Sequence, residues 1–532
     1  MVRLTGELTI DDVVAVARGR EPVRLPPETR DRIVASRDAV DDIVDGDRRV
    51  YGVNTGFGDL QNVSISRDDL DELQENLLRS HATAVGDPLP TDVVRAAMLA
   101  RANALAVGAS GVRVELVEKL VELLNEGVHP VVPADGSTDD LGAAAHIGLV
   151  LMGEGEVERL PPRESRSDER RTDRRRNESR RSDERDHRRS SERRGDRGVD
   201  AAVALSEAGV DPLEPKAKEG LAVVSGTPIT TGLLALGVHD TERLVRTADL
   251  AGAWTFELLG EAPTAFAERV TEVRPYEGHA ESAANVRRLV GATPDGDHEM
   301  TQDPLSLRCI PQVHGALREQ LAFARRVVET ELASATDNPL VFPDGETFSC
   351  GNFNGQQMAG AADMLRTAVQ KVGRVSERRA NKLVSDVDGD GVAAFLAANP
   401  GLESGMMIGH YTATGLAAEL ETRTSASGRS VTVSGGQEDV HSLGTLAARH
   451  LAEAVEAVRR IVAVELLCAS RRTELAGTEL PDALAAVAAD LDEAVGLPLA
   501  DTSLHEEIRE TAELVADGRF AETAETAGAD LV

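Results

Sequence analysis

The chain has 532 residues, of which 41% are hydrophobic and only 2% aromatic, and its formal net charge is −33. This length exceeds one small core and predicts several domains or one extended helical body. The strong negative charge argues against nucleic-acid binding, because a phosphate backbone would be repelled by most of the surface.

Positive charge comes almost entirely from arginine, since lysine occurs only at positions 119, 216, 218, 371 and 382. Excess carboxylate with scarce lysine predicts a halophilic protein in a saline cytosol, where salt screens self-repulsion. The three cysteines form no CxxC pair, which argues against a disulfide framework and a metal site. The N-terminus lacks a signal-peptide core, and no apolar run looks long enough for a membrane span. We therefore expect a cytoplasmic protein.

The first 160 residues predict helices joined by short loops. Thr9 caps a helix that ends at Gly19, and further helices are expected at 30–44, 66–81, 91–107 and 114–125. Three glycines in the stretch YGVNTGFG give a loop that places Tyr51. His81 ends one helix, where a lone histidine is more often a polar or dipole partner than a catalyst.

From Glu164 to Arg197 the chain contains no aliphatic or aromatic residue. Such a composition cannot form a core and predicts a disordered insert over 161–198. One interpretation is an RNA-binding arm of the Arg/Ser type, but interleaved acidic residues cancel most of its charge. A shifted coding frame is a third interpretation, and the sequence leaves the question open.

From residue 199 onward the pattern is helical. Helices are expected at 231–259, 313–332, 356–384 and 441–473, followed by an acidic helical tail over 480–532. Long helices rich in Ala and Leu are typical of a large bundle. The predicted fold is therefore all-α, with a loop-rich N-terminal domain over 1–160 and a helical bundle over 199–532.

Short motifs recur in a fixed order between about Tyr51 and about Arg449: YGVNTGFG, SHATAVGDPL, GEGE, KEGLA, QDPLSLRC, SATDNPLVF, GNFNGQ, SERR and QEDVHSLG. Together they resemble the aromatic amino-acid ammonia-lyase family, and most closely its histidine ammonia-lyases. The resemblance implies conversion of L-histidine to urocanate and ammonia in histidine degradation. It also implies a homotetramer whose sites combine subunits, so that Tyr51 and Glu438 would meet only on assembly.

The same resemblance implies an electrophilic group, 4-methylideneimidazole-5-one (MIO), made from an internal Ala-Ser-Gly without an external cofactor. Tyr51 resembles the catalytic base, which needs a lowered pKa. Glu438 resembles the acid that faces the substrate imidazole, and His81 a substrate-side histidine. Arg308 resembles the clamp on the substrate carboxylate. Two further family site positions are occupied by Gln302 and Phe353.

The stretch VVPADGSTDDLGAAAH departs from this pattern where MIO would form, because it is three residues shorter and lacks the Ala-Ser-Gly. The alignment Ala134-Asp135-Gly136 puts Asp in place of the dehydrating Ser. The alignment Gly136-Ser137-Thr138 needs a β-branched residue to supply the cyclising nitrogen. Three other positions also differ from the family pattern. The family has an Asn where this chain has Ser225, a Tyr where it has Leu305 and commonly a His where it has Asn354. The alternatives are an inactive family member or a sequence damaged near 134–198.

Overall fold

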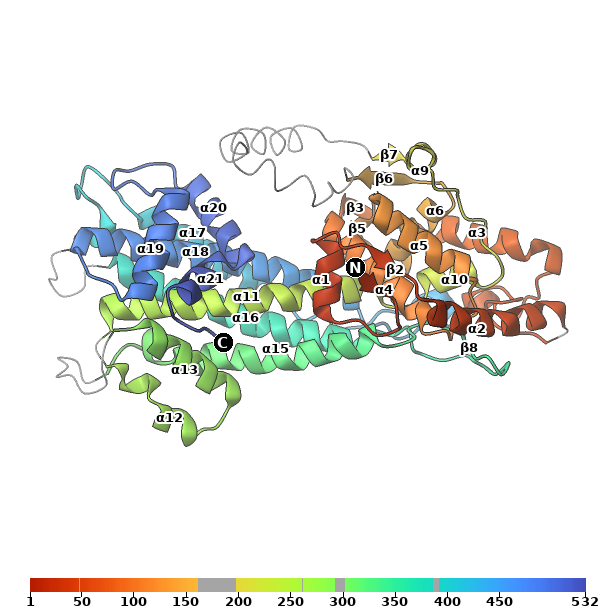
Figure 1. Cartoon of the computed structure of the whole chain (residues 1–532), viewed down its shortest axis with the longest axis horizontal. Helices are drawn as coiled ribbons and strands as arrows, with labels where there is room; N and C mark the ends of the chain where they lie inside the picture. Colours follow the sequence, from red (N-terminus) through yellow and green to blue (C-terminus); the bar gives the residue numbers. More distant parts are fainter. Residues whose placement is uncertain (47, 161–197, 261, 292–301, 386–391) are drawn as a thin grey trace. The chain divides into compact units, whose positions relative to one another are not determined.

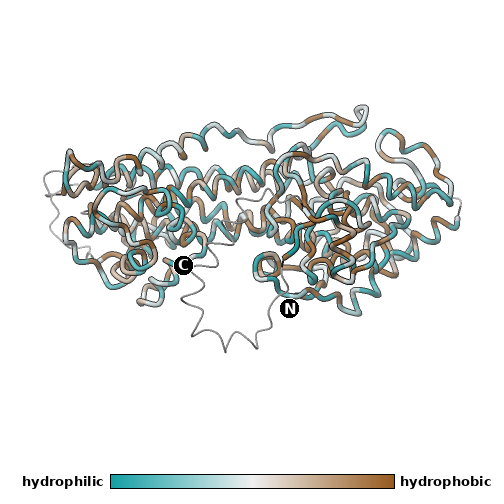
Figure 2. The backbone as a smooth tube through the Cα atoms, turned by 90° about the horizontal axis from the view of Figure 1, so that it is seen from above, coloured by the Kyte–Doolittle hydropathy of each residue, from teal (hydrophilic) through white to brown (hydrophobic). Residues whose placement is uncertain are grey.

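The computed structural model describes residues 1–46, 48–160, 198–260, 262–291, 302–385 and 392–532 (Figure 1). It is 62% helix and 6% strand, which confirms the predicted all-α class. The predicted insert lies outside the described residues, apart from its last position. Apolar and polar residues alternate along the helical tubes in Figure 2, as expected where one side of a helix is buried.

The chain forms two compact units. Unit 1 comprises Met1–Leu236, Val328–Gln356 and Arg429–Thr445, and unit 2 comprises Gly237–Val327, Gln357–Gly428 and Leu446–Val532. Four long helices contribute residues to both: α11 (Pro228–Leu259), α15 (Ile310–Leu332), α16 (Gln356–Val384) and α18 (Gly444–Ala476). The division at residues 160 and 199 stays a prediction.

The shorter helices of unit 1 are α1 (Ile10–Ala17), α2 (Pro27–Asp45), α3 (Leu70–His81), α4 (Thr91–Ala106), α5 (Val114–Glu126), α6 (Leu141–Leu151), α9 (Ala201–Ala208) and α10 (Glu219–Val224). The helices α1 to α5 match the predicted ranges to within a few residues, whereas no range was predicted for α6, α9 or α10. Thr9 forms a capping box with Asp12 at the start of α1. Ser66 does not cap α3 directly, because the 3₁₀ turn Arg67–Asp69 lies between them and the Ser66 hydroxyl binds Asp69.

Short strands join these helices. The pairs are β1 (Val2–Arg3) with β2 (Val23–Arg24), β3 (Val85–Pro88) with β5 (Pro133–Asp135), and β8 (Leu340–Val341) with β9 (Thr347–Phe348); β4 (Val128–Pro130), β6 (Glu156–Arg159) and β7 (Val199–Asp200) form a three-stranded sheet. Only the pair β1–β2 is parallel among the strands of the described ranges. The β3–β5 pair matters most for function, because it fixes the start of the segment where MIO would form.

Unit 2 contains the remaining short helices: α12 (Glu268–Glu272), α13 (Glu277–Leu289), α14 (Leu305–Arg308), α17 (Met407–Glu421), α19 (Asp482–Val495), α20 (His505–Asp517) and α21 (Arg519–Thr526). Its core holds a buried ion pair between Arg379 of α16 and Glu465 of α18, with nitrogen–oxygen distances of 2.6 and 2.9 Å. Glu465 also accepts hydrogen bonds from Thr255 of α11 and Ser376 of α16. Three long helices are thereby tied together through one carboxylate.

One helical stretch, Glu219–Leu259, is long and apolar enough to cross a bilayer, with a mean hydropathy of 1.7 in its most apolar window. This corrects the expectation that no apolar run has the necessary length. The whole of that window is buried inside the fold. Core helices of large bundles have the same length and composition, so the stretch is weak support for a membrane span.

Candidate functional site

Tyr51 lies on a loop whose shape is set by its neighbours in the sequence. The flanking residues Val50 and Val53 are buried in a hydrophobic cluster of unit 1. Asn54 closes the loop, because its side chain accepts a bond from the Val50 amide at 2.8 Å. The Gly58 amide donates to the Tyr51 hydroxyl at 3.4 Å. The loop therefore presents a half-buried tyrosine, as the glycine pattern predicts.

His81 is the last residue of α3 and is half-buried. Its Nδ1 lies 2.9 Å from the carbonyl oxygen of Leu77 and 3.1 Å from the hydroxyl of Ser80. A proton on Nδ1 satisfies the carbonyl and leaves Nε2 as the acceptor. Helix α3 thus fixes both the position and the tautomer of this imidazole.

Glu438 lies on a loop of unit 1, residues 430–442, which we call the Glu438 loop. A Cβ atom added to Gly58 would lie 2.5 Å from the Ser434 hydroxyl and 3.9 Å from the Glu438 carboxylate. The Glu438 charge acts on both Tyr51 and His81. These three side chains meet within a single chain, which corrects the expectation that Tyr51 and Glu438 meet only on assembly.

The electrostatics of this cluster differ from the expected pattern in one respect. Burial raises the pKa of Tyr51, the Gly58 amide lowers it, and the Glu438 charge raises it further, with a net upward shift. Burial lowers the pKa of His81 against smaller upward effects of Leu77 and Glu438. The cluster holds a neutral imidazole and a protonated phenol, so the expected lowering of the Tyr51 pKa is wrong for this chain as it stands.

The segment 133–141 has an ordered conformation of its own. Ala134 and Asp135 lie in β5, where Asp135 pairs with Val85 of β3. Gly136 follows with a φ of +87°, a left-handed conformation suited to glycine. The Ser137 hydroxyl then donates to the carbonyl of Asp139.

Two buried carboxylates complete this segment. Asp139 accepts hydrogen bonds from His441 Nδ1 at 2.7 Å and from the Ser442 hydroxyl. Asp140 accepts four hydrogen bonds at the start of α11 and α18, from the amides of Ile229 and Thr230 and the hydroxyls of Thr230 and Thr445. Because the side chains at 441 and 442 bind Asp139, α18 begins at Gly444 rather than at the expected His441.

The geometry of this segment does not fit formation of MIO. Ring closure requires the amide nitrogen of the third residue to reach the carbonyl carbon of the first. Ala134 and Asp135 are held in an extended strand, which separates these atoms. In the alternative triplet 136–138 the third residue is the β-branched Thr138.

The tripeptide Ala-Ser-Gly occurs elsewhere in the chain, at 109–111 and 426–428. At 109–111 the first carbonyl is bound by the Val341 amide, and the last amide by the Ser36 hydroxyl, both at 2.9 Å. At 426–428 the central amide donates to Asp363 in unit 2. Neither tripeptide belongs to the Tyr51–His81–Glu438 cluster.

Two other predicted positions lie in unit 1. Ser225 is buried at the end of α10, and its carbonyl accepts a hydrogen bond from the buried Arg101. Phe353 is half-buried in the loop before α16. Asn354 turns that loop, since its side chain accepts a bond from the Gln356 amide at 3.1 Å.

Gln302 and Arg308 lie in unit 2, where Gln302 precedes the short helix α14 and Arg308 is its last residue. Gln302 is exposed, and Leu305 is 63% exposed. Arg308 is half-buried, and its Nε atom has no hydrogen-bond partner within the part of the chain that the structure describes. The predicted carboxylate clamp and the Tyr51–His81–Glu438 cluster therefore belong to different units.

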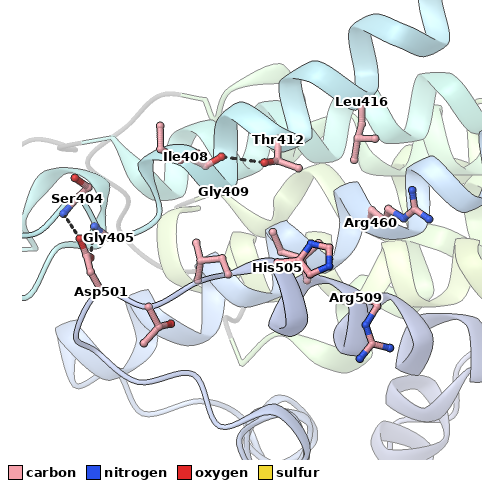
Figure 3. A pocket seen from close by; sticks show the side chains of 13 residues that line it. Ser404, Gly405, Ile408, Gly409, Thr412, Leu416, Arg460, Asp501, His505 and Arg509 are labelled. Atoms are coloured by element: carbon pink, nitrogen blue, oxygen red, sulfur yellow. Dashed lines mark hydrogen bonds between the residues drawn. The ribbon is translucent and has the colours of Figure 1, made fainter. Parts of the chain in front are cut away.

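A cavity of about 640 Å³ lies in unit 2 between α17 and the start of α20 (Figure 3). Its walls are apolar at Ile408 and Ile508 and polar at His505. The Asp501 carboxylate closes one end by accepting bonds from the amides at positions 404 and 405, at 2.7 and 2.8 Å. None of the predicted site residues lines this cavity.

Over the described ranges, no group of three His, Cys, Asp or Glu side chains is arranged to hold a metal.

Comparisons with known proteins identify the family of this chain. A family model described as aromatic amino acid lyase matches residues 8–493. The chain is 41% identical to a histidine ammonia-lyase of Symbiobacterium thermophilum over 100% of this chain and 99% of that protein. It is 42% identical to a histidine ammonia-lyase of Caldanaerobacter subterraneus, over 88% and 86% of the two chains.

Solved structures show the same fold. A histidine ammonia-lyase from Trypanosoma cruzi matches with a TM-score of 0.86 and 34% identity, over 99% of this chain and 95% of that one. A tyrosine aminomutase from Streptomyces globisporus matches with a TM-score of 0.88 and 32% identity, over 99% and 98%. The fold and the site define an enzyme scaffold of the ammonia-lyase and aminomutase class, whose members act on carbon–nitrogen bonds. The chain belongs to the aromatic amino acid lyase family.

Proposed function

We propose that this protein is a histidine ammonia-lyase, which removes ammonia from L-histidine to give urocanate. The observation that carries the proposal is the placing of Glu438 beside His81 and Tyr51 in one unit. A carboxylate and an imidazole in one cluster suit a substrate with a polar, proton-bearing ring. A phenyl ring would leave the buried part of Glu438 without a partner. The identity of 41–42% with proteins of that name supports the same substrate.

In this proposal each predicted residue keeps its role. Tyr51 is the base for the β-proton, and Glu438 faces the imidazole together with His81. Arg308 binds the substrate carboxylate through its guanidinium, whose Nε has no protein partner within the described residues. Gln302 and Phe353 complete the site.

We also propose that the working enzyme is a homotetramer. Arg308 and Gln302 lie in unit 2, while the other proposed site residues lie in unit 1. The exposure of Gln302 and of Leu305 leaves the surface around α14 open to a neighbouring subunit. Such an arrangement gives each site residues from more than one copy of the chain. The net charge of −33 is consistent with the proposed cytoplasmic, saline environment.

A second candidate function is histidine binding without turnover. Members of this family form MIO from their own backbone, and the segment 133–141 does not fit that reaction. The carboxylates of Asp139 and Asp140 and the Ser137 hydroxyl are instead engaged in hydrogen bonds of the fold. A chain without the electrophile keeps the means to bind L-histidine and loses the means to expel its amine. A sequence altered near 134–198 remains the third alternative, which resequencing of the gene decides.

The experiment that tests the function uses the protein of this sequence at high salt. Urocanate formation from L-histidine is followed by ultraviolet absorbance, and L-histidine binding by calorimetry. Urocanate production establishes the lyase activity and overturns the conclusion that the segment 133–141 does not fit formation of MIO. Binding without urocanate establishes the second candidate. A folded protein that neither binds nor converts L-histidine contradicts both.

A further inference from the structure

The Glu438 loop is closed on itself by hydrogen bonds across its two sides. The Val433 amide donates to the carbonyl of Glu438 at 2.9 Å. The His441 amide donates to the Ser430 hydroxyl at 2.8 Å, and the Thr432 hydroxyl reaches the next carbonyl after Glu438 at 3.4 Å. These bonds join the two sides of the loop, so the contacts at its tip and at its base decide where Glu438 lies.

The tip of the loop is anchored by the loop that carries Tyr51. Gly58 has a φ of +53°, and any side chain there would collide with the Ser434 hydroxyl. A Cβ atom at Gly435 would lie 3.5 Å from the Asp59 carboxylate. These contacts involve short or flexible groups. They place the tip of the loop next to the Tyr51 loop, but they do not fix the exact position of Glu438.

The base of the loop is anchored by one buried carboxylate. Asp139 binds His441 Nδ1 at 2.7 Å and also the Ser442 hydroxyl. His441 and Ser442 are buried, and His441 follows Glu438 by only three positions in the sequence. The bond to Asp139 places the imidazole proton on Nδ1 and fixes the ring orientation.

We infer that Asp139 is a positioning residue for Glu438, acting through His441 and Ser442, and so sets how well the site recognises the imidazole of L-histidine. The inference rests on the proposed function and adds a residue to it. Charged and hydrogen-bonded contacts depend steeply on distance, and a displacement of about 1 Å is enough to weaken recognition strongly. Asn at position 139 keeps one acceptor oxygen and places an NH2 donor where the other oxygen stood, so either His441 or Ser442 loses its acceptor and the base of the loop is released.

A double-mutant cycle on L-histidine binding tests this inference. We compare the unaltered protein with Asp139→Asn, Glu438→Gln and the combined variant, using calorimetry to obtain Kd. If Asp139 acts through Glu438, Asp139→Asn weakens binding about tenfold when Glu438 is present and less than about twofold when it is introduced into the Glu438→Gln variant. Asp87→Asn is the matched control, because Asp87 is an exposed carboxylate on β3 and makes the same change of charge.

Equal weakening in both backgrounds, or none in either, overturns the inference while leaving the proposed function standing. Failure of the unaltered protein to bind L-histidine overturns both. His441→Asn is the second variant if Asp139→Asn does not fold, since it removes the 2.7 Å contact and keeps Ser442. It must show the same dependence on Glu438, and Asp139→Glu must restore part of the lost affinity.

Discussion

At the scale of single residues, Tyr51 is unusual because both burial and a neighbouring carboxylate favour its neutral form. Glu438→Gln removes the carboxylate, so we expect the pKa of Tyr51 to fall. Spectrophotometric titration of the folded protein measures this, and Tyr51→Phe identifies the component that belongs to Tyr51 among the three tyrosines. Asp439→Asn, an exposed neighbour, is expected to leave the titration unchanged. An unaltered Tyr51 midpoint in Glu438→Gln would contradict the geometry of the cluster.

The raised pKa of Tyr51 determines the direction in which this residue changes the stability of the fold with pH. The pKa of Tyr51 in the folded protein lies above the unfolded value of about 10. The unfolded chain therefore loses this proton first as the pH rises. The contribution of Tyr51 to stability is complete below about pH 10 and is lost as the pH rises through the folded pKa.

Glu438 is expected to determine the affinity for L-histidine as well as the pKa of Tyr51. In Glu438→Gln we expect L-histidine binding to weaken about tenfold, or about 1.4 kcal/mol, because the imidazole loses a charged acceptor. Calorimetric titration measures the change, with Asp439→Asn as the control for loss of charge. Equal affinity in Glu438→Gln and the unaltered protein would remove Glu438 from the site.

The site was partly predictable from single residues. Tyr51, His81 and Glu438 were found by their motifs, and the structure brings them together. The roles of Asp139 and His441 were not predicted, because they are 302 positions apart and nothing in the two stretches that contain them indicates that they bind each other. A raised Tyr51 pKa was also out of reach, since burial and the approach of Glu438 are properties of the folded chain.

At the scale of elements, the segment 133–141 is the point where family pattern and chain diverge. Replacing Asp139 with Gly-Ala-Ser-Gly restores the family spacing and supplies the missing tripeptide. We expect the intact mass to fall below the calculated value by two water molecules, and urocanate to form from L-histidine. Gly-Ala-Ala-Gly is the matched control, because it has the same length and lacks the Ser hydroxyl whose elimination gives the methylidene group. A full calculated mass in both variants would show that more than the tripeptide is missing.

The buried carboxylate of Glu465 links three long helices, and its loss should be costly. Glu465→Gln leaves the Arg379 guanidinium buried without a charged partner, so we expect unfolding to become easier by about 3 kcal/mol. Chemical denaturation measures this. Glu456→Gln on the same helix is the control, because Glu456 is 49% exposed and its pairs with arginines are worth less than about 1 kcal/mol. Similar effects of both changes would contradict this account.

Helices were the most predictable elements, because apolar spacing and capping residues are local signals. The range 356–384 was predicted to the residue, and Gly127 ends α5 in the left-handed conformation expected of a stop signal. The two-residue strands were not predicted, since strands this short carry no periodicity. The start of α18 was misplaced because Asp139, far away in sequence, holds His441 outside the helix.

At the scale of the whole molecule, the charge of −33 sets how the protein responds to salt. Screening of self-repulsion predicts that the thermal midpoint rises by several degrees between about 0.1 M and 2 M KCl. Differential scanning calorimetry measures this, with sucrose at equal osmolality as the control for solute exclusion. A midpoint that falls or stays constant with KCl would contradict the halophilic prediction. The all-α class was predictable because composition and length act over the whole chain.

The four hydrogen bonds that Asp140 accepts come from residues well outside the segment 133–141. Asp140 thus anchors this point of the fold through hydrogen bonds that do not involve positions 134–138. A cell that monitors its proteins by folding, through chaperones and proteases, would retain this chain whether or not it can make its electrophile. Measurements of expression level and of thermal stability would not distinguish it from an active enzyme. A loss of catalytic activity through this segment would therefore persist in a population without a change in protein abundance.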